Sequence, residues 1–450
     1  MSVEKNYEMT KKMIIGEGLE YDLNCYQTKR NNNVVVIGGA GTGKTRGIVE
    51  PNILQATGSY VISDPKGNLY QKYKRFLEVN GYEVKKIDFV HPEQSVKYNL
   101  FEGTEDPYNP IKSNANIVNL ANTIVSVRHD GSRHMDPFWD EAATLLLTAL
   151  IAALLRFCSK QDHSFSAIEK MVSMMLVDED AVDLKTDLDL LFDQFEEQDA
   201  EAFAIKKYKA FRVAAARTLK SIQISLNALI SNYANEYMDM MMMGHELDVT
   251  MIGRRKTALF ICASDTERTY DGLVNVMFTQ IMNGLVSFAD TRPNSRLPIP
   301  VRFIMDDFAT NVRITDFPRM ISSIRSRGIS TMIILQSEAQ LMQYYEKDAQ
   351  TILSNCDTYV YLGGNDIDTA KSVAERADKS LHTVLEMPVG CEWVFRRGEK
   401  PVFTRTIDLE EYQKTISRWQ DLKTERRPRD YRKDMNGIAP KYGFSKEKTG

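Results

Sequence analysis

The feature that most constrains the fold is the stretch VVVIGGAGTGKT, residues 34–45, in which a run of β-branched residues breaks into glycines. Its last eight residues fit the pattern GxxxxGK(S/T), and residues 46–49 after them can open a helix. In that setting backbone N–H groups surround a phosphate, Lys44 reaches the β and γ oxygens, and the Thr45 hydroxyl ligates Mg²⁺. The helix N-terminus adds partial positive charge. The residues expected to hold the phosphates are Gly38, Gly39, Ala40, Gly41, Thr42, Gly43, Lys44 and Thr45.

Length, charge and cysteine usage narrow the class of protein. The 450 residues exceed one ordinary domain, and the composition, 43% hydrophobic and 26% charged, is typical of a globular protein. The formal net charge of -4 argues against a wholly basic nucleic-acid coat, so any DNA contact must be local. The five cysteines are scattered without a CxxC pair, which indicates a reduced, cytoplasmic protein with cysteines packed as small hydrophobes.

The sequence shows neither a signal peptide nor an evident membrane span. The N-terminal residues 1–18 are polar. The most apolar run, residues 142–155, is shorter than the roughly 20 residues that a transmembrane helix needs. We therefore expect this run to form a buried helix.

The order of strand-like and helix-like segments predicts an α/β fold. After the glycine loop, residues 60–63 are strand-like, 69–79 helical and 83–89 strand-like again, which is how a parallel sheet begins. From residue 113 to about 237 helical periodicity dominates. Strand signals then return at 256–264, 301–307, 330–337 and 358–364, followed by a probable hairpin over 391–405 with Gly398 in its turn.

This pattern predicts a nucleotide-binding domain with a mainly parallel sheet, interrupted by an all-α domain. The predicted parts are 1–112 (nucleotide-binding, first part), 113–245 (all-α), 246–412 (nucleotide-binding, second part) and 413–450, a basic and loose tail.

The segment VRFIMDD, residues 301–307, supplies the acidic partner that a phosphate loop needs. Its apolar residues end in two aspartates at the expected carboxyl end of a parallel strand, where such sites lie. We assign Asp306 to Mg²⁺ and Asp307 to polarising the attacking water. The alternative is a pair of exposed carboxylates at a strand end. Gln336 stands at the tip of the next strand, where its amide can sense the γ-phosphate or position the water.

Two arginines, Arg325 and Arg327, end a predicted helix between the aspartates and Gln336. One interpretation is that either of them reaches the nucleotide of a neighbouring subunit as an arginine finger, which can accelerate hydrolysis by about 10³–10⁵. The other is that both simply suit the helix dipole, which favours cations at a C-terminus. The residues alone leave the two interpretations equal.

Taken in order, these segments resemble one family, the coupling proteins of type IV secretion and bacterial conjugation. The resemblance spans roughly residues 30–405 and rests on the ordered set GGAGTGKT, SDPKG (63–67), MDPFWDEAA (135–143), FIMDDFA (303–309), SRGIS (326–330) and IILQS (333–337). The family consists of RecA-like hexameric ATPases related to DNA-pumping translocases. By its place between Asp306 and Gln336, Arg325 matches the family's arginine finger, which favours it over Arg327.

The resemblance implies a function and partners. The chain is expected to use ATP and Mg²⁺, to form a homo-hexamer when active, and to drive single-stranded DNA with a relaxase-type protein cargo into a type IV secretion channel. That work takes place at the cytoplasmic face of the inner or plasma membrane, and the all-α domain is expected to recognise the cargo.

The sequence departs from the family in two ways. The second acid after the apolar strand is usually Glu in the family and is Asp307 here. A carboxylate withdrawn by one methylene matters because catalytic geometry is sensitive to displacements of about 1 Å. Family members also usually begin with transmembrane helices, which this chain lacks, so that an anchor is either encoded outside it or supplied by a partner.

Two other functions stay open at this point. One is a nucleotide-gated cargo receptor with little hydrolysis, which Asp307 favours. The other is a double-stranded DNA translocase or packaging ATPase, against which SDPKG and the helical insertion argue through the resemblance.

Overall fold

The structure is a computed structural model, and it describes residues 12–126, 137–175, 185–214, 219–264, 269–308, 314 and 316–416. Most of the expected basic tail, residues 417–450 of 413–450, lies outside the described residues. Met135 and Asp136 of MDPFWDEAA and Ala309 of FIMDDFA also lie outside them.

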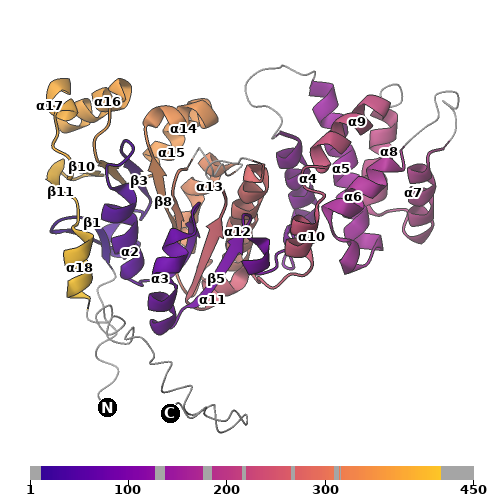
Figure 1. Cartoon of the computed structure of the whole chain (residues 1–450), viewed down its shortest axis with the longest axis horizontal. Coiled ribbons are helices and arrows are strands. Elements are labelled where there is room, and N and C mark those ends of the chain that lie inside the picture. The colour runs from indigo at the N-terminus through magenta and orange to yellow at the C-terminus, as the bar shows by residue number, and fades with distance from the viewer. Residues whose placement is uncertain are drawn as a thin grey trace, which may run out of the picture.

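A nine-stranded sheet forms the left part of the molecule in Figure 1. Seven neighbouring strands, from β9 to β5, run parallel, and β10 and β11 add an antiparallel hairpin at one edge. In sheet order the strands are β11 (Val402–Arg405), β10 (Cys391–Arg396), β9 (Thr358–Tyr361), β3 (Val34–Ile37), β8 (Ile329–Leu335), β7 (Val301–Met305), β4 (Ser59–Ser63), β6 (Thr257–Cys262) and β5 (Glu83–Asp88). The predicted fold class, α/β with a mainly parallel sheet, is confirmed.

The central strands are apolar on both faces because helices cover both faces. In β3, Val34 and Val36 pack into one hydrophobic cluster while Val35 and Ile37 pack into another, as the alternation of side chains along a strand requires. The first cluster includes helices α2 (Glu50–Leu54), α3 (Asn68–Val79) and α18 (Leu409–Thr415). The second includes α12 (Asp271–Asp290), α13 (Phe317–Ser323), α14 (Glu338–Tyr345), α15 (Ala349–Ser354), α16 (Ile367–Ala377) and α17 (Leu381–Leu385).

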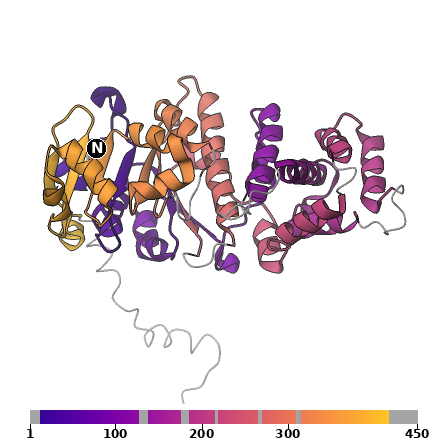
Figure 2. The same cartoon turned by 90° about the horizontal axis from the view of Figure 1, so that it is seen from above.

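A helical part is inserted between β5 and β6. The described residues from 110 to 242 form helices and no strand. Figures 1 and 2 show these helices beyond α12, on its side away from the sheet. They are α4 (Pro110–Ser126), α5 (Pro137–Phe157), α6 (Phe165–Ser173), α7 (Asp187–Gln198), α8 (Phe203–Ala214), α9 (Leu219–Ile230) and α10 (Glu236–Met242); α11 (Thr250–Arg254) then leads into β6. That residues 113–245 form a separate domain remains our proposal.

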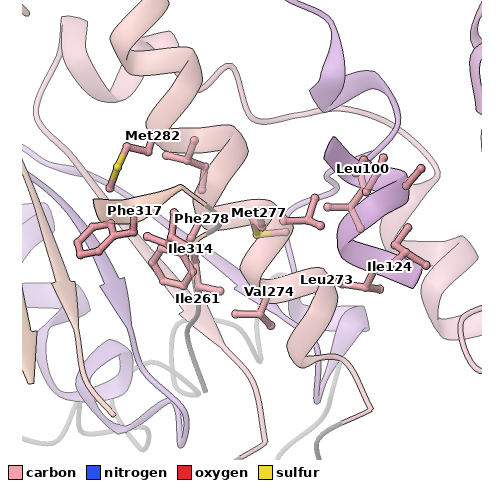
Figure 3. Close-up of a cluster of buried hydrophobic side chains, with 14 of the residues drawn as sticks. Leu100, Ile124, Ile261, Leu273, Val274, Met277, Phe278, Met282, Ile314 and Phe317 are labelled. Atoms are coloured by element: carbon pink, nitrogen blue, oxygen red, sulfur yellow. The ribbon is translucent and has the colours of Figure 1, made fainter. Parts of the chain in front are cut away.

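Helix α12 joins the two parts through one continuous apolar core. In Figure 3 Phe278 and Met282 lie toward Ile261, Ile314 and Phe317 on the sheet side. Other side chains of the same helix, Leu273 and Met277, lie toward Ile124 and Leu100 on the helical side. The core of the sheet therefore extends through α12 into the inserted helices.

Two described helices are long and apolar enough to cross a membrane by length and composition. They are Phe138–Phe157 in α5 and Asp271–Asp290, which is α12. The most apolar windows of these two segments are 61% and 67% buried inside the protein. Their burial fits core helices, as expected for residues 142–155.

The N-terminal residues form a small hairpin that the sequence analysis did not predict. Strands β1 (Lys12–Gly16) and β2 (Leu19–Asp22) pair antiparallel around Gly18, whose φ of 68° suits a glycine. The Asn52 side chain in α2 accepts a hydrogen bond from the Ile14 N–H and donates one to the Ile14 carbonyl. This pair of bonds fixes the hairpin against the helix that follows the glycine loop, and α1 (Cys25–Thr28) then leads to β3.

Candidate functional site

The glycine loop leaves β3 at the carboxyl edge of the sheet and turns directly into a helix. Gly41 and Gly43 have φ values of 76° and 88°, a region that glycine enters without steric cost. The first turn of the helix, Thr45–Val49, is π-helical and leads into α2. Pro51 accounts for this widening, because a proline ring in a regular helix clashes with the carbonyl of the residue four positions earlier.

The Lys44 ammonium group folds back over the loop. Its Nζ donates hydrogen bonds to the carbonyls of Gly38 at 2.6 Å and Gly39 at 2.9 Å. Burial lowers the pKa of Lys44, while the charges of Asp306 and Asp307 oppose that change. The ammonium therefore lies in the electrostatic field of both aspartates.

Thr45 and Asp306 lie in direct contact. The Thr45 Oγ1 donates a hydrogen bond of 2.8 Å to the Asp306 Oδ2. Burial raises the pKa of the Asp306 carboxyl group; the bond from Thr45 opposes this change, and the charge of Asp307 adds to it. A hydroxyl and a carboxylate side by side are two oxygen ligands of the kind that Mg²⁺ prefers.

The rest of a Mg²⁺ shell has to come from elsewhere. Within the described ranges, no group of three or more His, Cys, Asp and Glu side chains is arranged to hold a metal ion. Mg²⁺ commonly takes one or two carboxylate ligands and fills its octahedron with substrate phosphates and water. Thr45 and Asp306 fit that mode of binding.

Asp307 follows Asp306 in a left-handed backbone conformation. Its φ is 52°, which aspartate tolerates better than most residues, and its N–H donates to the Asp306 Oδ1 at 3.1 Å. The side chain is half-buried. The turn thus places a second carboxylate directly after the first at the end of β7, and the charges of both act on Lys44.

Gln336 directly follows the last residue of β8 and lies beside the glycine loop. The N–H of Gly38 donates to the carbonyl of Leu335 at 3.1 Å, so β3 and β8 end at the same level of the sheet. The Gln336 side chain is exposed, and its N–H donates to the Gln340 Oε1 at 2.8 Å. Gln336 is therefore within one strand spacing of the loop, at the same edge.

The structure brings together five of the predicted site residues and keeps the arginines apart from them. Lys44, Thr45, Asp306, Asp307 and Gln336 lie at the carboxyl ends of three neighbouring strands, β3, β7 and β8.

Arg325 and Arg327 lie in a 3₁₀ turn, Ile324–Arg327, just before β8 begins, and hence at the opposite edge of the sheet. The Arg325 Nη2 donates to the Cys25 carbonyl at 2.8 Å. Arg327 forms a bidentate ion pair with Asp290, at 2.8 Å and 3.0 Å, and also donates to the Ser323 carbonyl. The Arg327 guanidinium is thus occupied within its own subunit.

Two further parts of the loop's surroundings escaped the sequence analysis. The first is the glycine pair after β9. The N–H of Gly39 donates to the Gly363 carbonyl at 2.8 Å, and a Cβ on Gly364 would lie 3.3 Å from the Gly39 nitrogen. A side chain there would crowd the loop. The pair was visible in the sequence as the LGG that ends the strand, but it carried no motif.

The second is a cavity of about 660 Å³ beside the loop. The loop and its helix contribute Gly43, Arg46 and Gly47, and the segment after β11 contributes most of the remaining lining, from Arg405 to Thr415. Arg46 also forms an exposed ion pair with Glu410 at 2.8 Å. Nothing in the sequence of this C-terminal segment marked it as a neighbour of the loop.

The SDPKG segment has a structural role at the same edge. The carboxylate of Asp64, which follows β4, accepts hydrogen bonds from the N–H groups of Leu69 at 3.2 Å and Tyr70 at 2.8 Å. It thereby satisfies free donors in the first turn of α3. Burial raises the pKa of Asp64 and these bonds oppose the change. Gly67, with φ of 67°, makes the turn between strand and helix.

The comparisons with known proteins agree with this geometry. A family model described as Type IV secretory system Conjugative DNA transfer matches residues 2–380. No curated protein matches the chain. Among solved structures, an unbound form of the bacterial conjugative coupling protein TrwBdeltaN70 is similar, with a TM-score of 0.62 at 14% identity over 88% of each chain.

Two further structures of the plasmid coupling protein TrwB are also similar, each covering 90% of this chain and 92% of the other at 15% identity. One is a complex with the non-hydrolysable ATP analogue ADPNP (TM-score 0.63), and the other contains ADP and Mg²⁺ (TM-score 0.61). At these identities the likeness is one of fold.

Proposed function

The chain belongs to the type IV secretory conjugative DNA transfer family, and from that premise we propose that it is the ATP-driven motor of DNA transfer. A family member acts as a coupling protein in conjugation, at a membrane-associated secretion system. The proposed cycle is more specific. The protein binds ATP and Mg²⁺ at the glycine loop, hydrolyses the ATP, and moves single-stranded DNA with an attached relaxase-type protein into the secretion channel, working at the cytoplasmic face of the membrane.

The observation that carries this proposal is the contact between Thr45 and Asp306, with Lys44 beside them. Thr45 and Asp306 would hold a Mg²⁺ ion, which when bound would neutralise phosphate charge, and Lys44, which now donates to the Gly38 and Gly39 carbonyls, would supply a further positive charge to the phosphate oxygens. TrwB, which shares the fold, has been solved with ADPNP and with ADP and Mg²⁺. These complexes support ATP as the ligand here.

The cavity beside the loop suits the rest of the nucleotide. It starts at Gly43 and Arg46, so a nucleotide held by its phosphates would extend its ribose and base toward residues 405–415. Its volume of about 660 Å³ lies within the usual range for small-ligand pockets. We propose that the segment after β11 contacts the base.

The position of Arg325 supports hydrolysis at a subunit interface. Its turn lies at the edge of the sheet opposite the glycine loop, so the arginine cannot serve the nucleotide of its own subunit. In a homo-hexameric ring the same residue can reach the γ-phosphate held by the next subunit and stabilise charge in the transition state. Arg327 is held by Asp290 and is the weaker candidate.

A second candidate function is a nucleotide-gated cargo receptor that hydrolyses little ATP. The observation that favours it is Asp307, which is one methylene shorter than the family's usual glutamate and sits in a left-handed turn. A steady-state ATPase assay, with and without single-stranded DNA, separates the two. Turnover that DNA stimulates supports the motor, and ATP binding without turnover supports the receptor.

The motor is tested most directly by Lys44→Ala, compared with Lys400→Ala in the exposed turn between β10 and β11. Loss of the phosphate's charge partner is expected to reduce ATP turnover and conjugal transfer by about a hundredfold or more without unfolding the protein. Lys400→Ala is expected to leave both unchanged. Transfer at the parental frequency in the Lys44→Ala strain would refute the motor.

A further inference from the structure

A second cavity lies at the amino edge of the sheet, on the opposite side from the glycine loop. It measures about 440 Å³ and is bordered by the starts of β4, β7 and β8 together with the loop around α1. Three arginines line it: Arg296, Arg302 and Arg325. The described residues that line this cavity include neither Asp nor Glu.

Arg302 is the most unusual of the three because it is buried. Its residue is only 7% exposed, and its hydrogen bonds go to neutral groups, the Asn52 Oδ1 at 3.3 Å and the Ser330 Oγ at 3.5 Å. A buried charge without a counter-charge is costly, and buried arginines are ordinarily paired. Burial accordingly lowers the pKa of Arg302.

Within the part of the chain that the structure describes, the other two guanidinium groups also lack an anionic partner. Arg296 lies over the ring of Tyr26, with its Cζ 4.7 Å from the ring centre, and Arg325 donates to the Cys25 carbonyl. Across the described ranges, no carboxylate comes within ion-pair distance of Arg296, Arg302 or Arg325. Three cations that share one cavity raise one another's electrostatic energy, and a bound anion would lower it.

The remaining walls are partly apolar. Leu23, Tyr26, Pro300 and Ile329 contribute the apolar surface, and the cavity volume falls within the range of small-ligand pockets. Polar side chains also line the cavity: Asn24, Asn32, Thr57, Ser59 and Ser330. Arginine recognises phosphate through parallel hydrogen bonds, and aromatic faces accept a stacked ring. A ligand that suits all of these features carries a phosphate at one end and a ring at the other.

We propose that this cavity binds a small phosphate monoester with an aromatic body, of the size of a nucleoside monophosphate, with its phosphate between Arg296, Arg302 and Arg325. The site is separate from the glycine loop, and the proposal goes beyond the motor function. A carboxylate of a second protein chain is the less suitable occupant, because its backbone would have to cover the opening for a short side chain to reach the buried Arg302.

The site shares Arg325 with the proposed subunit interface. A phosphate bound between the arginines would hold Arg325 within its own subunit and withdraw it from the neighbouring nucleotide. Occupancy of the cavity would therefore oppose hydrolysis between subunits without touching the glycine loop.

The test is isothermal titration calorimetry on the full chain carrying Lys44→Ala, so that phosphate binding at the glycine loop is weakened. The probes are AMP, adenosine and inorganic phosphate. We expect AMP to bind with one site per chain. Adenosine, which lacks the phosphate, and inorganic phosphate, which lacks the ring, are each expected to bind at least about tenfold more weakly.

Arg296→Ala, added to the same chain, removes a partly exposed lining residue and is expected to weaken AMP binding by about tenfold or more. Arg325→Ala is expected to do the same from the other wall. The matched control is Arg292→Ala, a nearby exposed arginine that does not line the cavity. Melting temperatures without ligand check that each variant is folded.

Three results would overturn the proposal. One is the absence of AMP binding. Another is equal AMP affinity in the Arg296→Ala, Arg325→Ala and Arg292→Ala chains, which would place the ligand elsewhere. The last is a change of oligomeric state in Arg296→Ala, seen by light scattering, without any nucleotide effect, which would make the cavity a protein interface. None of these results bears on ATP binding at the loop, which the unmodified chain reports separately.

Discussion

Thr45 and Asp306 stand 261 residues apart in the chain, and the Thr45 hydroxyl donates a hydrogen bond of 2.8 Å to the Asp306 carboxylate. The bond joins the end of the glycine loop to the end of β7, two strands away in the sheet. The two oxygens are therefore already neighbours, which is the arrangement that the proposed Mg²⁺ site requires.

Asp306→Asn is expected to raise the stability of the ligand-free protein while lowering its ATP turnover. Burial raises the pKa of Asp306, so the folded protein holds this proton at pH values where the unfolded chain has lost it. The carboxyl group therefore favours folding at low pH, and that contribution is lost as pH rises through the raised pKa. Asparagine still accepts the bond from Thr45 and carries no charge. We expect the ligand-free variant to melt higher than the parent at about pH 8, with the difference shrinking toward about pH 5.

The same variant is expected to lose ATP turnover by about a hundredfold or more, because a Mg²⁺ ligand is gone. Asp368→Asn, in which an exposed carboxylate on α16 is changed, is the control for both measurements and should alter neither. Mg²⁺-dependent turnover at the parental rate in Asp306→Asn would show that the metal is held elsewhere.

Asp307→Glu tests whether the shortened carboxylate limits hydrolysis. If Asp307 polarises the attacking water, the longer side chain is expected to raise the rate of ATP hydrolysis, measured at saturating ATP and Mg²⁺. An unchanged rate would mean that another group activates the water, and Gln336 would be the next candidate. A lower rate would mean that the site is built around aspartate.

The left-handed backbone at this position demands a matched control. Glutamate tolerates a φ of 52° less well than aspartate, so Asp307→Glu can lower stability for a reason unrelated to catalysis. Asp378, after α16, has a φ of 53° and is exposed outside the site. The loss of melting temperature in Asp378→Glu therefore measures the backbone contribution alone.

Arg325→Ala is expected to keep the affinity for ATP at the glycine loop and to lose DNA-stimulated hydrolysis by about a thousandfold. The decisive measurement mixes Arg325→Ala subunits with Lys44→Ala subunits, each inactive alone. Mixed rings contain interfaces with an intact loop on one side and an intact arginine on the other, so activity should return. No recovery at any ratio, with mixed assembly confirmed, would leave Arg325 as a structural cation only.

Arg327→Ala is the matched control at the same turn. It removes the ion pair with Asp290, which is partly exposed, and is expected to cost at most about 1 kcal/mol of unfolding free energy. Hydrolysis should stay within severalfold of the parental rate. A loss as large as that of Arg325→Ala would assign the finger role to the whole turn.

The inserted helices are expected to fold as a unit of their own. Replacing residues 113–245 with a short linker should leave a sheet that still binds an ATP analogue, because all nine strands of the sheet and the glycine loop lie outside the replaced segment. The cut exposes the side of α12 that carries Leu273 and Met277, so the bridged protein should self-associate. Leu273→Gln in the bridged protein should reduce that association. If the bridged protein is unfolded by circular dichroism with and without this change, the division at these boundaries is wrong.

The strands of the sheet were the easiest part to predict from the sequence. The runs VVVI, SYVIS, TALFIC and VRFIM are short, apolar on both faces and ended by polar or glycine residues, and each forms a buried parallel strand. The site residues at the ends of β3, β7 and β8 were predictable for the same reason, since parallel strands present their carboxyl ends at one edge.

The rest depended on contacts that no local pattern records. The segment after β11 lies beside the glycine loop although more than three hundred residues separate the two in the chain. Its sequence, TRTIDLEEY, carries no motif. The hairpin of β1 and β2 was missed because it is held by Asn52 rather than by its own composition. The arginine cavity was invisible because Arg302 looks like an ordinary polar residue at the start of a strand.

The two-sided burial of helix α12 has a consequence for how the chain tolerates substitution. One of its long sides is covered by the sheet and another by the inserted helices, so only a narrow stripe of partly exposed polar residues, which includes Asn275, Thr279 and Asn283, stays open. Its hydropathy approaches that of a membrane span because its burial is two-sided. In a saturation survey of substitutions, positions that reject charge should therefore be spread around most of the circumference of α12. A single replacement at such a position should disturb both parts of the protein at once.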